Sequence, residues 1–438
     1  MLAAVLGVPI SAAAYGFLKL VSVLQQWLFT DLPEQLGFDR PPWWWPGPLL
    51  MVAGLLVGAT IRYLPGRGEH SPADGFKAGE GAPRPIDVPG IALAALATLA
   101  FGAVLGPEAP LIALGAGLAG WAVALAKRDA PAQATAVIAA AGSFAAIATL
   151  LGSPLLGAFL LMEASGLAGP MLGVVLLPGL LAAGVGALIF VGLQSWTGFG
   201  AFSLALPDLP PAGPPDVAQF GWAIVIGLVA PFVGTGIRRL ALVLRPHVER
   251  RLLLLTPLVG LGVAALAVGY AEATGKSISD VLFSGQDRIG PLLAGSADYT
   301  VATLLLLIAC KGVAYGLSMS AFRGGPVFPA MFLGAAGGMA LSHAPGLPLV
   351  AGAAMGIGAM SVAMLRLPLT SVLLATLLLF SDGLAVMPLV IVAVVVSHVV
   401  TARLTPLPVP VPSPDASVRS APTAPDTPSA PHPVPPGG

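Results

Sequence analysis

One carboxylate, Glu108, is the only charged residue between Val88 and Leu125, and long apolar runs lie on both sides of it. An ionisable side chain inside a membrane-like segment is costly, and it normally faces a cavity, a partner group or a transport pathway. We therefore expect Glu108 to belong to a functional site within a membrane. The alternative that the residues leave open is a structural carboxylate that caps a helix.

Prolines flank this carboxylate in the sequence Gly106-Pro107-Glu108-Ala109-Pro110. Proline lacks a backbone N–H and is tolerated in the first turn of a helix, so the pattern predicts a helix that begins here and runs through Trp121. The unpaired N–H groups and the positive dipole end of such a helix favour a bound anion. An anion and the Glu108 carboxylate would then compete for one position.

Composition indicates a polytopic membrane protein, because 56% of the 438 residues are hydrophobic and only 9% are charged. The net charge is zero, which gives no reason to expect a nucleic-acid partner. The single cysteine, Cys310, excludes an internal disulfide framework. His343 and His398 have no partners at metal-ligand spacing, so we expect neither a metal nor an organic cofactor.

The sequence favours a transport protein over an intramembrane hydrolase. Hydrolysis requires a nucleophile with a base, a pair of carboxylates or a metal set. No H-E-x-x-H motif is present, and the two acids that lie in apolar surroundings, Glu108 and Glu163, belong to separate segments. We therefore expect no enzymatic activity.

A second Gly/Pro interruption, Gly324-Gly325-Pro326-Val327-Phe328-Pro329, precedes another segment rich in small residues. Two interrupted segments at corresponding places in two halves point to a site built from inverted repeats. We predict an all-α polytopic membrane protein with halves at residues 1–215 and 216–405 and a disordered Pro-rich tail at 406–438. Many apolar segments are shorter than the roughly 20 residues of a perpendicular span, which predicts broken and tilted helices.

These motifs, taken in order, resemble those of the CLC family of voltage-gated chloride channels and chloride–proton antiporters. Gly106-Pro107-Glu108-Ala109-Pro110 resembles the family motif G-x-E-G-P, and Gly325-Pro326-Val327-Phe328-Pro329 is similar to G-x-F-x-P. Pro154-Leu155-Leu156-Gly157, ahead of Glu163, is similar to the segment between them. The resemblance covers roughly residues 62–403.

The resemblance implies a CLC-type inverted repeat and a homodimer in the lipid bilayer, in which each subunit has its own anion pathway. It makes Glu108 the gating residue of an anion site formed by helix N-termini. It assigns anion binding to seven residues near the two interruptions and to one serine hydroxyl: Gly106, Pro107, Ala109, Gly325, Pro326, Val327, Phe328 and Ser71. Ser71 lies in His70-Ser71-Pro72-Ala73-Asp74-Gly75, which we interpret as the break before another helix, although a serine before proline is also a common cap or turn residue.

Two departures from the family pattern bear on the mechanism. Ala109 replaces the second glycine of the first motif, and the inner proton-relay acid of the exchangers falls on Ala164, next to Glu163. We therefore expect movement of chloride or a similar small anion with weak or absent proton coupling. Glu163 is the candidate proton relay, and a residue that merely ends a helix is the alternative.

Two other functions stay open at this point: a proton-coupled chloride or fluoride antiporter, and a secondary transporter of organic anions on a different fold. A larger organic substrate would require more fixed polar groups at mid-membrane than the sequence offers. The richness in alanine, glycine and proline points to a bacterial source and hence to the bacterial plasma (inner) membrane.

Overall fold

The computed structural model of the chain describes residues 2–68, 70–76, 83–127, 130–166, 170–197, 215–378 and 383–405. Helices make up nearly all of the regular structure in these residues, as the apolar composition requires of a chain in lipid. The predicted tail at 406–438 lies outside the described residues.

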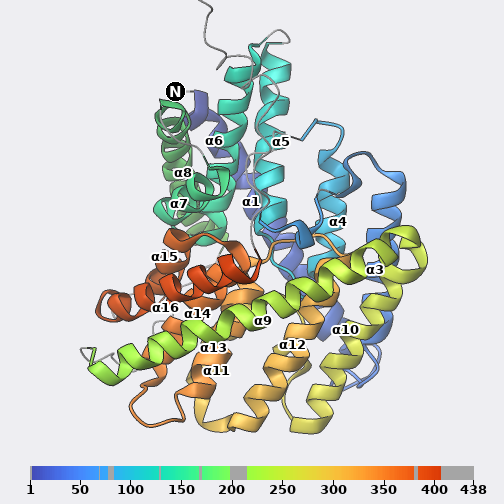
Figure 1. The fold of residues 1–438 in the computed structure, drawn as a ribbon. Coiled ribbons are helices and arrows are strands. Elements are labelled where there is room, and N and C mark those ends of the chain that lie inside the picture. The colour runs from blue at the N-terminus through green and yellow to red at the C-terminus, as the bar shows by residue number, and fades with distance from the viewer. Residues whose placement is uncertain are drawn as a thin grey trace, which may run out of the picture.

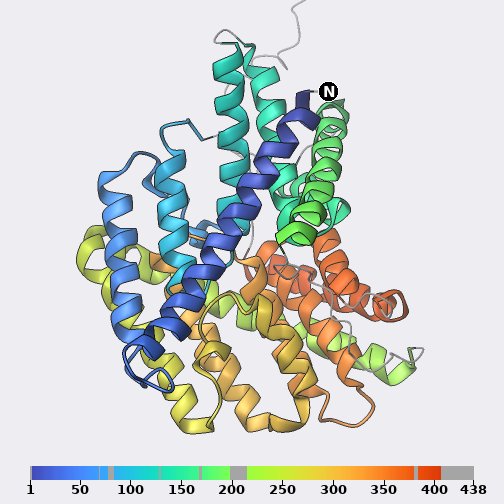
Figure 2. The ribbon, with the colours of Figure 1, turned by 180° about the vertical axis from the view of Figure 1, so that it is seen from behind.

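The first part of the chain forms a group of helices crossed by one oblique helix, α1, which is seen from behind in Figure 2. A π-helical turn at Trp27–Asp31 and the short α2, Leu32–Gln35, continue α1. The helices of this part are α1 Leu2–Gln26, α3 Pro46–Tyr63, α4 Val88–Ala100, α5 Glu108–Ala126, α6 Ala132–Leu151, α7 Pro154–Ser165 and α8 Pro170–Thr197.

The second part begins with α9, a 34-residue helix that runs obliquely across the molecule in Figure 1. Proline interrupts its sequence at Pro231 and Pro246. The helices of this part are α9 Val217–Arg250, α10 Leu252–Thr274, α11 Ile289–Ala294, α12 Val301–Ala321, α13 Val327–Leu341, α14 Leu349–Leu365, α15 Pro368–Leu378 and α16 Gly383–Leu404.

Helix length and composition identify a multi-pass membrane protein. Within the described residues, 9 helical segments are long and apolar enough to cross a bilayer, and α1, α5 and α12 are among them. Other apolar helices have only 10–17 residues, and α4 and α13 belong to this shorter class. The prediction of an all-helical membrane protein with short and tilted helices is therefore confirmed.

Small residues bring the helices around the two interruptions into close contact. A side chain at Gly115 of α5 would overlap the Gly142 carbonyl of α6, and one at Gly334 of α13 would overlap the Gly356 carbonyl of α14. Close backbone approach of this kind is a main source of helix association in lipid. The same arrangement in both parts of the chain supports an internal repeat, while the boundaries of the two halves stay a prediction.

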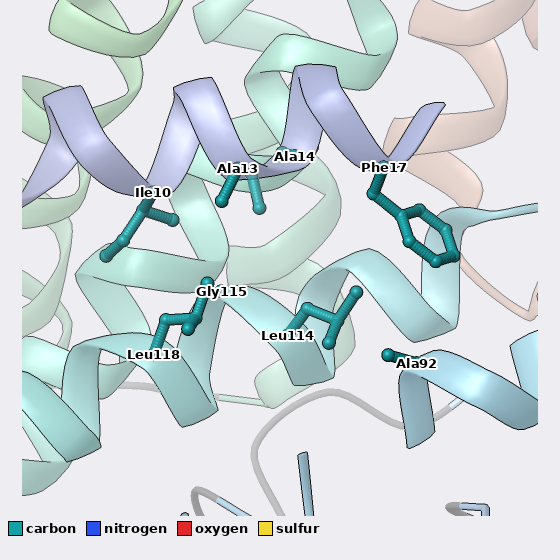
Figure 3. Close-up of a pocket in the computed structure, with 9 residues that line it drawn as sticks. Ile10, Ala13, Ala14, Phe17, Ala92, Leu114, Gly115 and Leu118 are labelled. Atoms are coloured by element: carbon teal, nitrogen blue, oxygen red, sulfur yellow. The ribbon is translucent and has the colours of Figure 1, made fainter. Parts of the chain in front are cut away.

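An apolar cavity of about 190 Å³ lies beside α5, between that helix and α1 (Figure 3). Its lining residues are Ile10, Ala13, Ala14, Phe17, Ala92, Leu114, Gly115, Leu118 and Ala146. None of these side chains is a hydrogen-bond donor. A dehydrated anion would be strongly destabilised in such surroundings, so this cavity does not suit an anion.

Candidate functional site

Glu108 is the first residue of α5, with Pro107 as the residue that precedes the helix. Its side chain is fully buried, at 0% exposure. The predicted helix start is therefore confirmed, and the helix extends somewhat past Trp121 to Ala126. The carboxylate lies where the helix leaves its first N–H groups without intrahelical partners.

The two interruptions predicted from the sequence meet at an isolated antiparallel bridge between Gly106 and Gly325. The N–H of Gly106 donates to the Gly325 carbonyl at 2.8 Å, and the N–H of Gly325 donates to the Gly106 carbonyl at 2.6 Å. Because α5 and α13 begin shortly after these glycines, the bridge brings their N-termini together. We refer to the space between the two N-termini as the helix-terminus site.

The Glu108 carboxylate occupies the helix-terminus site. Its Oε1 atom accepts a hydrogen bond of 2.9 Å from the backbone N–H of Phe328. The backbone N–H groups of Val327 and of Glu108 itself also interact favourably with the carboxylate. Oε2 has no hydrogen-bond partner among the described residues. Partial positive charges at helix ends stabilise negative charge here, and among the described residues no ion pair of Glu108 with a cationic side chain is present.

The two glycines leave room for this carboxylate. A Cβ atom built on Gly325 would overlap Glu108 Oε2, and one built on Gly106 would overlap both carboxylate oxygens. Any larger residue at either position would compete with the carboxylate, or with an anion, for the same space. The glycines of both motifs are thus required by close approach of a charged group to the backbone.

One face of α12 holds the segments around this site. The Tyr315 hydroxyl donates to the Pro326 carbonyl at 2.8 Å, just before α13 begins. The Ser318 hydroxyl oxygen accepts from the backbone N–H of Val104 at 3.1 Å, in the interruption before α5. Together with Lys311, these side chains follow helical spacing along an otherwise apolar helix.

Lys311 is fully buried, and its ammonium group donates to four consecutive backbone carbonyls. These carbonyls belong to residues 280–283, at distances of 3.0–3.3 Å. The N–H of Phe283 in turn donates to the Gly102 carbonyl at 3.1 Å, in the interruption before α5. Lys311 therefore compensates its buried charge with carbonyl dipoles and holds a loop that supports the site.

Ser71 is buried and directly precedes a 3-10 turn, Pro72–Asp74. Residues 77–82 lie outside the described part of the chain, and the next described helix begins at Val88. The hydroxyl of Ser71 donates to the Met319 carbonyl of α12 at 3.4 Å. A turn of this length has no macrodipole comparable with that of α5 or α13, and the role of Ser71 in anion binding stays a prediction.

Glu163 lies near the end of α7 and contacts the N-terminus of α15. Its carboxylate accepts hydrogen bonds from the N–H of Leu369 at 2.9 Å and from the N–H and hydroxyl of Thr370 at 2.7 and 2.6 Å. A carboxylate at a helix N-terminus satisfies orphan donors and complements the helix dipole. This geometry accounts for Glu163 as a cap between two helices.

Comparison with known proteins identifies the family. The family model described as "Voltage gated chloride channel" matches residues 53–402. The chain belongs to the CLC family. It is therefore an anion transport protein and not an enzyme, as the sequence predicts. Membership of this family also excludes the alternative of an organic-anion transporter on a different fold.

Curated relatives match most of the chain. The protein described as "Putative ion-transport protein YfeO" of Escherichia coli O7:K1 (strain IAI39 / ExPEC) is 28% identical over 356 residues, which is 79% of both chains. The protein of that name from Shigella boydii serotype 4 (strain Sb227) gives the same values.

Solved CLC structures share the fold at low identity. A slow cyanobacterial Cl⁻/H⁺ antiporter has a TM-score of 0.75 and 20% identity, with 93% of this chain and 95% of that chain covered. A CLC-type fluoride/proton antiporter has a TM-score of 0.69 and 21% identity, covering 92% and 94%. A eukaryotic CLC transporter has a TM-score of 0.65 and 17% identity, covering 91% and 71%.

The structure thus brings together the residues predicted from the two interruptions, whereas Ser71 lies against α12 and Glu163 against α15. The sequence analysis did not identify Tyr315 or Ser318. A signal for them was present, since Lys311, Tyr315 and Ser318 are polar residues at helical spacing within an apolar segment.

Proposed function

We propose that the protein moves chloride or a similar small anion through the helix-terminus site, with Glu108 as the gate. The observation that carries the proposal is the hydrogen bond from the Phe328 N–H to the Glu108 carboxylate. A negatively charged group already occupies a place lined by backbone donors, and a free anion has the same requirements. Gly106, Pro107, Ala109, Gly325, Pro326, Val327 and Phe328 would form its surroundings, with Ser71 as the hydroxyl expected from the resemblance.

The character of the donors fits transport better than tight binding. Helix ends and backbone N–H groups supply partial charges, so an anion would be attracted without being held by a full cationic partner. Conduction requires binding that is favourable enough for the anion to enter and weak enough for it to leave. A single small anion would find donors at the ends of α5 and α13 when the carboxylate moves away.

Gating follows from the charge of Glu108. While the carboxylate is ionised and occupies the site, it repels an anion and fills its place. Protonation removes the charge, and a Gln side chain imitates this neutral form. The flux is therefore expected to rise as the pH falls.

Proton coupling is proposed to be weak or absent. Glu163 uses its carboxylate to bind the N-terminus of α15, and Ala164 stands at the position that the resemblance assigns to the inner acid. Proton-coupled antiport of chloride or fluoride is the second candidate, because two solved structures with the same fold are described as antiporters of these anions. In that case Glu163 would be the residue to test as the relay.

The assembly and location are proposed from family membership and relatives. A homodimer with an independent pathway in each subunit is the arrangement that the resemblance implies. The relatives from Escherichia coli and Shigella boydii are bacterial proteins, which supports a place in the bacterial plasma membrane.

The test is chloride efflux from liposomes that contain the purified protein, with the external pH recorded at the same time. We expect efflux from the parent protein, faster efflux from Glu108→Gln, and little proton movement in either. Glu272→Gln is the matched control, since it makes the same chemical change at an exposed position of α10 and should leave the efflux unchanged.

Each other outcome has a defined meaning. Uphill proton movement in the parent that Glu108→Gln abolishes would replace the proposal by proton-coupled antiport. A folded Glu108→Gln protein without any efflux would contradict the gating role. Absence of efflux for chloride, fluoride and nitrate in all variants would contradict the proposed function as a whole.

A further inference from the structure

Tyr315 of α12 is fully buried, and its hydroxyl donates to the carbonyl of Pro326 at 2.8 Å. Pro326 is the residue directly before α13, so this carbonyl belongs to the peptide bond at which the helix begins. The nitrogen of the same peptide bond is that of Val327. One hydrogen bond from α12 therefore acts on the peptide group that carries the first N–H of α13.

The two ends of this peptide bond face opposite ways. The bond is trans and planar, so its C=O and N–H point in opposite directions. The N–H of Val327 interacts favourably with the Glu108 carboxylate in the helix-terminus site, whereas the carbonyl meets the Tyr315 hydroxyl. Tyr315 thus lies behind the donor, and it can influence an anion in the site without contacting that anion.

A hydrogen bond to the carbonyl has two effects on the N–H of the same peptide group. It fixes the plane of the peptide bond, and hence the direction in which Val327 donates. It also polarises the group, since hydrogen bonds that form a chain strengthen one another in surroundings of low dielectric constant. The chain here runs from the Tyr315 hydroxyl through the peptide group to the charged occupant of the site.

An ordinary helix start needs no such contact from another helix. The carbonyl just before a helix accepts a bond from within that helix, as Pro107 before α5 does from the Leu111 N–H at 3.0 Å. The alternative explanation for Tyr315 is that a buried tyrosine merely satisfies its own hydroxyl. The two explanations differ in whether the strength of this hydroxyl as a donor affects anion binding.

We propose that Tyr315 is a positioning residue of the helix-terminus site, which orients and strengthens the Val327 N–H as a donor to the permeating anion. This inference rests on the proposed function and adds a residue that the motifs do not contain. The ionised Glu108 carboxylate uses the same donor, so loss of the hydroxyl weakens the binding of gate and anion together. The Glu108→Gln background separates the two, because the charged competitor is absent there.

The experiment measures chloride binding to the purified Glu108→Gln protein by calorimetry. Tyr315→Phe removes only the hydroxyl, and in this background it should raise the chloride Kd about threefold, as expected when a donor to a charged group loses part of its strength. Replacement of Tyr315 by 3-fluorotyrosine should lower the Kd below that of Glu108→Gln alone, because fluorine withdraws electrons and makes the hydroxyl a stronger donor. A purely structural role would give no such graded response.

Two control variants are made in the same background. Tyr270→Phe is the same chemical change at a fully buried tyrosine of α10, whose hydroxyl has no hydrogen-bond partner among the described residues. Ser397→Ala removes a buried hydroxyl of α16 that donates to the Ala359 carbonyl of α14 at 2.7 Å. Both should leave the chloride Kd unchanged, although Ser397→Ala should lower the apparent Tm.

The outcomes distinguish this inference from the proposed function. An unchanged Kd in Tyr315→Phe, or an equal rise in the two controls, would overturn the inference and leave the proposed function intact. A rise in Tyr315→Phe without a decrease for 3-fluorotyrosine would overturn it as well, because the role would then be structural only. If Tyr315→Phe does not fold, the 3-fluorotyrosine protein alone decides. If Glu108→Gln binds neither chloride nor fluoride, the proposed function fails first.

Discussion

The backbone N–H of Phe328 donates a hydrogen bond of 2.9 Å to the carboxylate of Glu108, across 220 positions of the sequence. This bond joins the first turn of α13 to the first residue of α5. It places an acid where two helix N-termini converge, which is the arrangement that favours negative charge. The transport mechanism proposed for this CLC protein follows from that single contact.

Gly325→Ala should expel the carboxylate and also obstruct the anion. The new Cβ atom would overlap Glu108 Oε2 and lie 3.1 Å from the Ala109 nitrogen. Since a methyl group would fill space that both charged groups require, we expect the chloride efflux from liposomes to fall at least tenfold. The efflux should stay low when Glu108→Gln is added.

Gly337→Ala is the control for this substitution. Gly337 lies in α13, the helix that begins shortly after Gly325, and a Cβ atom there would meet no atom within 4 Å. We expect the chloride efflux of Gly337→Ala to equal that of the parent protein. Its stability should be equal or slightly higher, because alanine is a better helix former than glycine by about 1 kcal/mol. Parent-like efflux in Gly325→Ala would show that anions pass by another route.

Lys311→Met should destabilise the protein strongly. It retains most of the side-chain volume but leaves four buried carbonyls without their shared donor. Loss of one partner from a buried charged set typically costs about 3–5 kcal/mol. We expect a clearly lower apparent Tm in detergent, together with lower efflux because the loop at 280–283 also bonds Gly102.

Lys276→Met serves as the comparison for Lys311. Its ammonium lies 4.5 Å from the centre of the Tyr299 ring and is only half-buried. Removal of such a cation–π contact costs about 1 kcal/mol or less, so the apparent Tm should change little. Equal stability of the two variants would contradict the role given to the carbonyls around Lys311.

Glu163→Ala should loosen the contact between α7 and α15. Its carboxylate supplies acceptors to Leu369 and Thr370, and loss of bonds to a charged group costs about 1–3 kcal/mol each. We expect a lower apparent Tm and an unchanged ratio of protons to anions moved in the efflux assay. Full stability together with loss of proton movement would instead support Glu163 as a relay.

The sequence predicts those features that depend on local chemistry. The apolar composition requires helices, and the Gly/Pro interruptions at Glu108 and Phe328 mark where α5 and α13 begin. Since proline at a helix start and a lone acid in an apolar run have few physical explanations, the position of the site follows from them.

Features that depend on contacts between distant segments could not be predicted in this way. Nothing local indicates that Gly106 pairs with Gly325, or that Lys311 meets the carbonyls of a loop. The surroundings of Ser71 could not be predicted for a related reason, because a serine before proline fits a 3-10 turn as well as a longer helix. In the structure Ser71 precedes the 3-10 turn Pro72–Asp74 and donates to the Met319 carbonyl of α12.

The most direct test of the central claim is the anomalous diffraction signal of bromide in crystals of Glu108→Ala. This variant removes the carboxylate and leaves the donors at Val327 and Phe328 in place. We expect a bromide peak within hydrogen-bond distance of the Phe328 nitrogen, where the carboxylate oxygen lies at 2.9 Å in the parent protein. A well-folded Glu108→Ala structure with bromide bound only elsewhere would contradict the account.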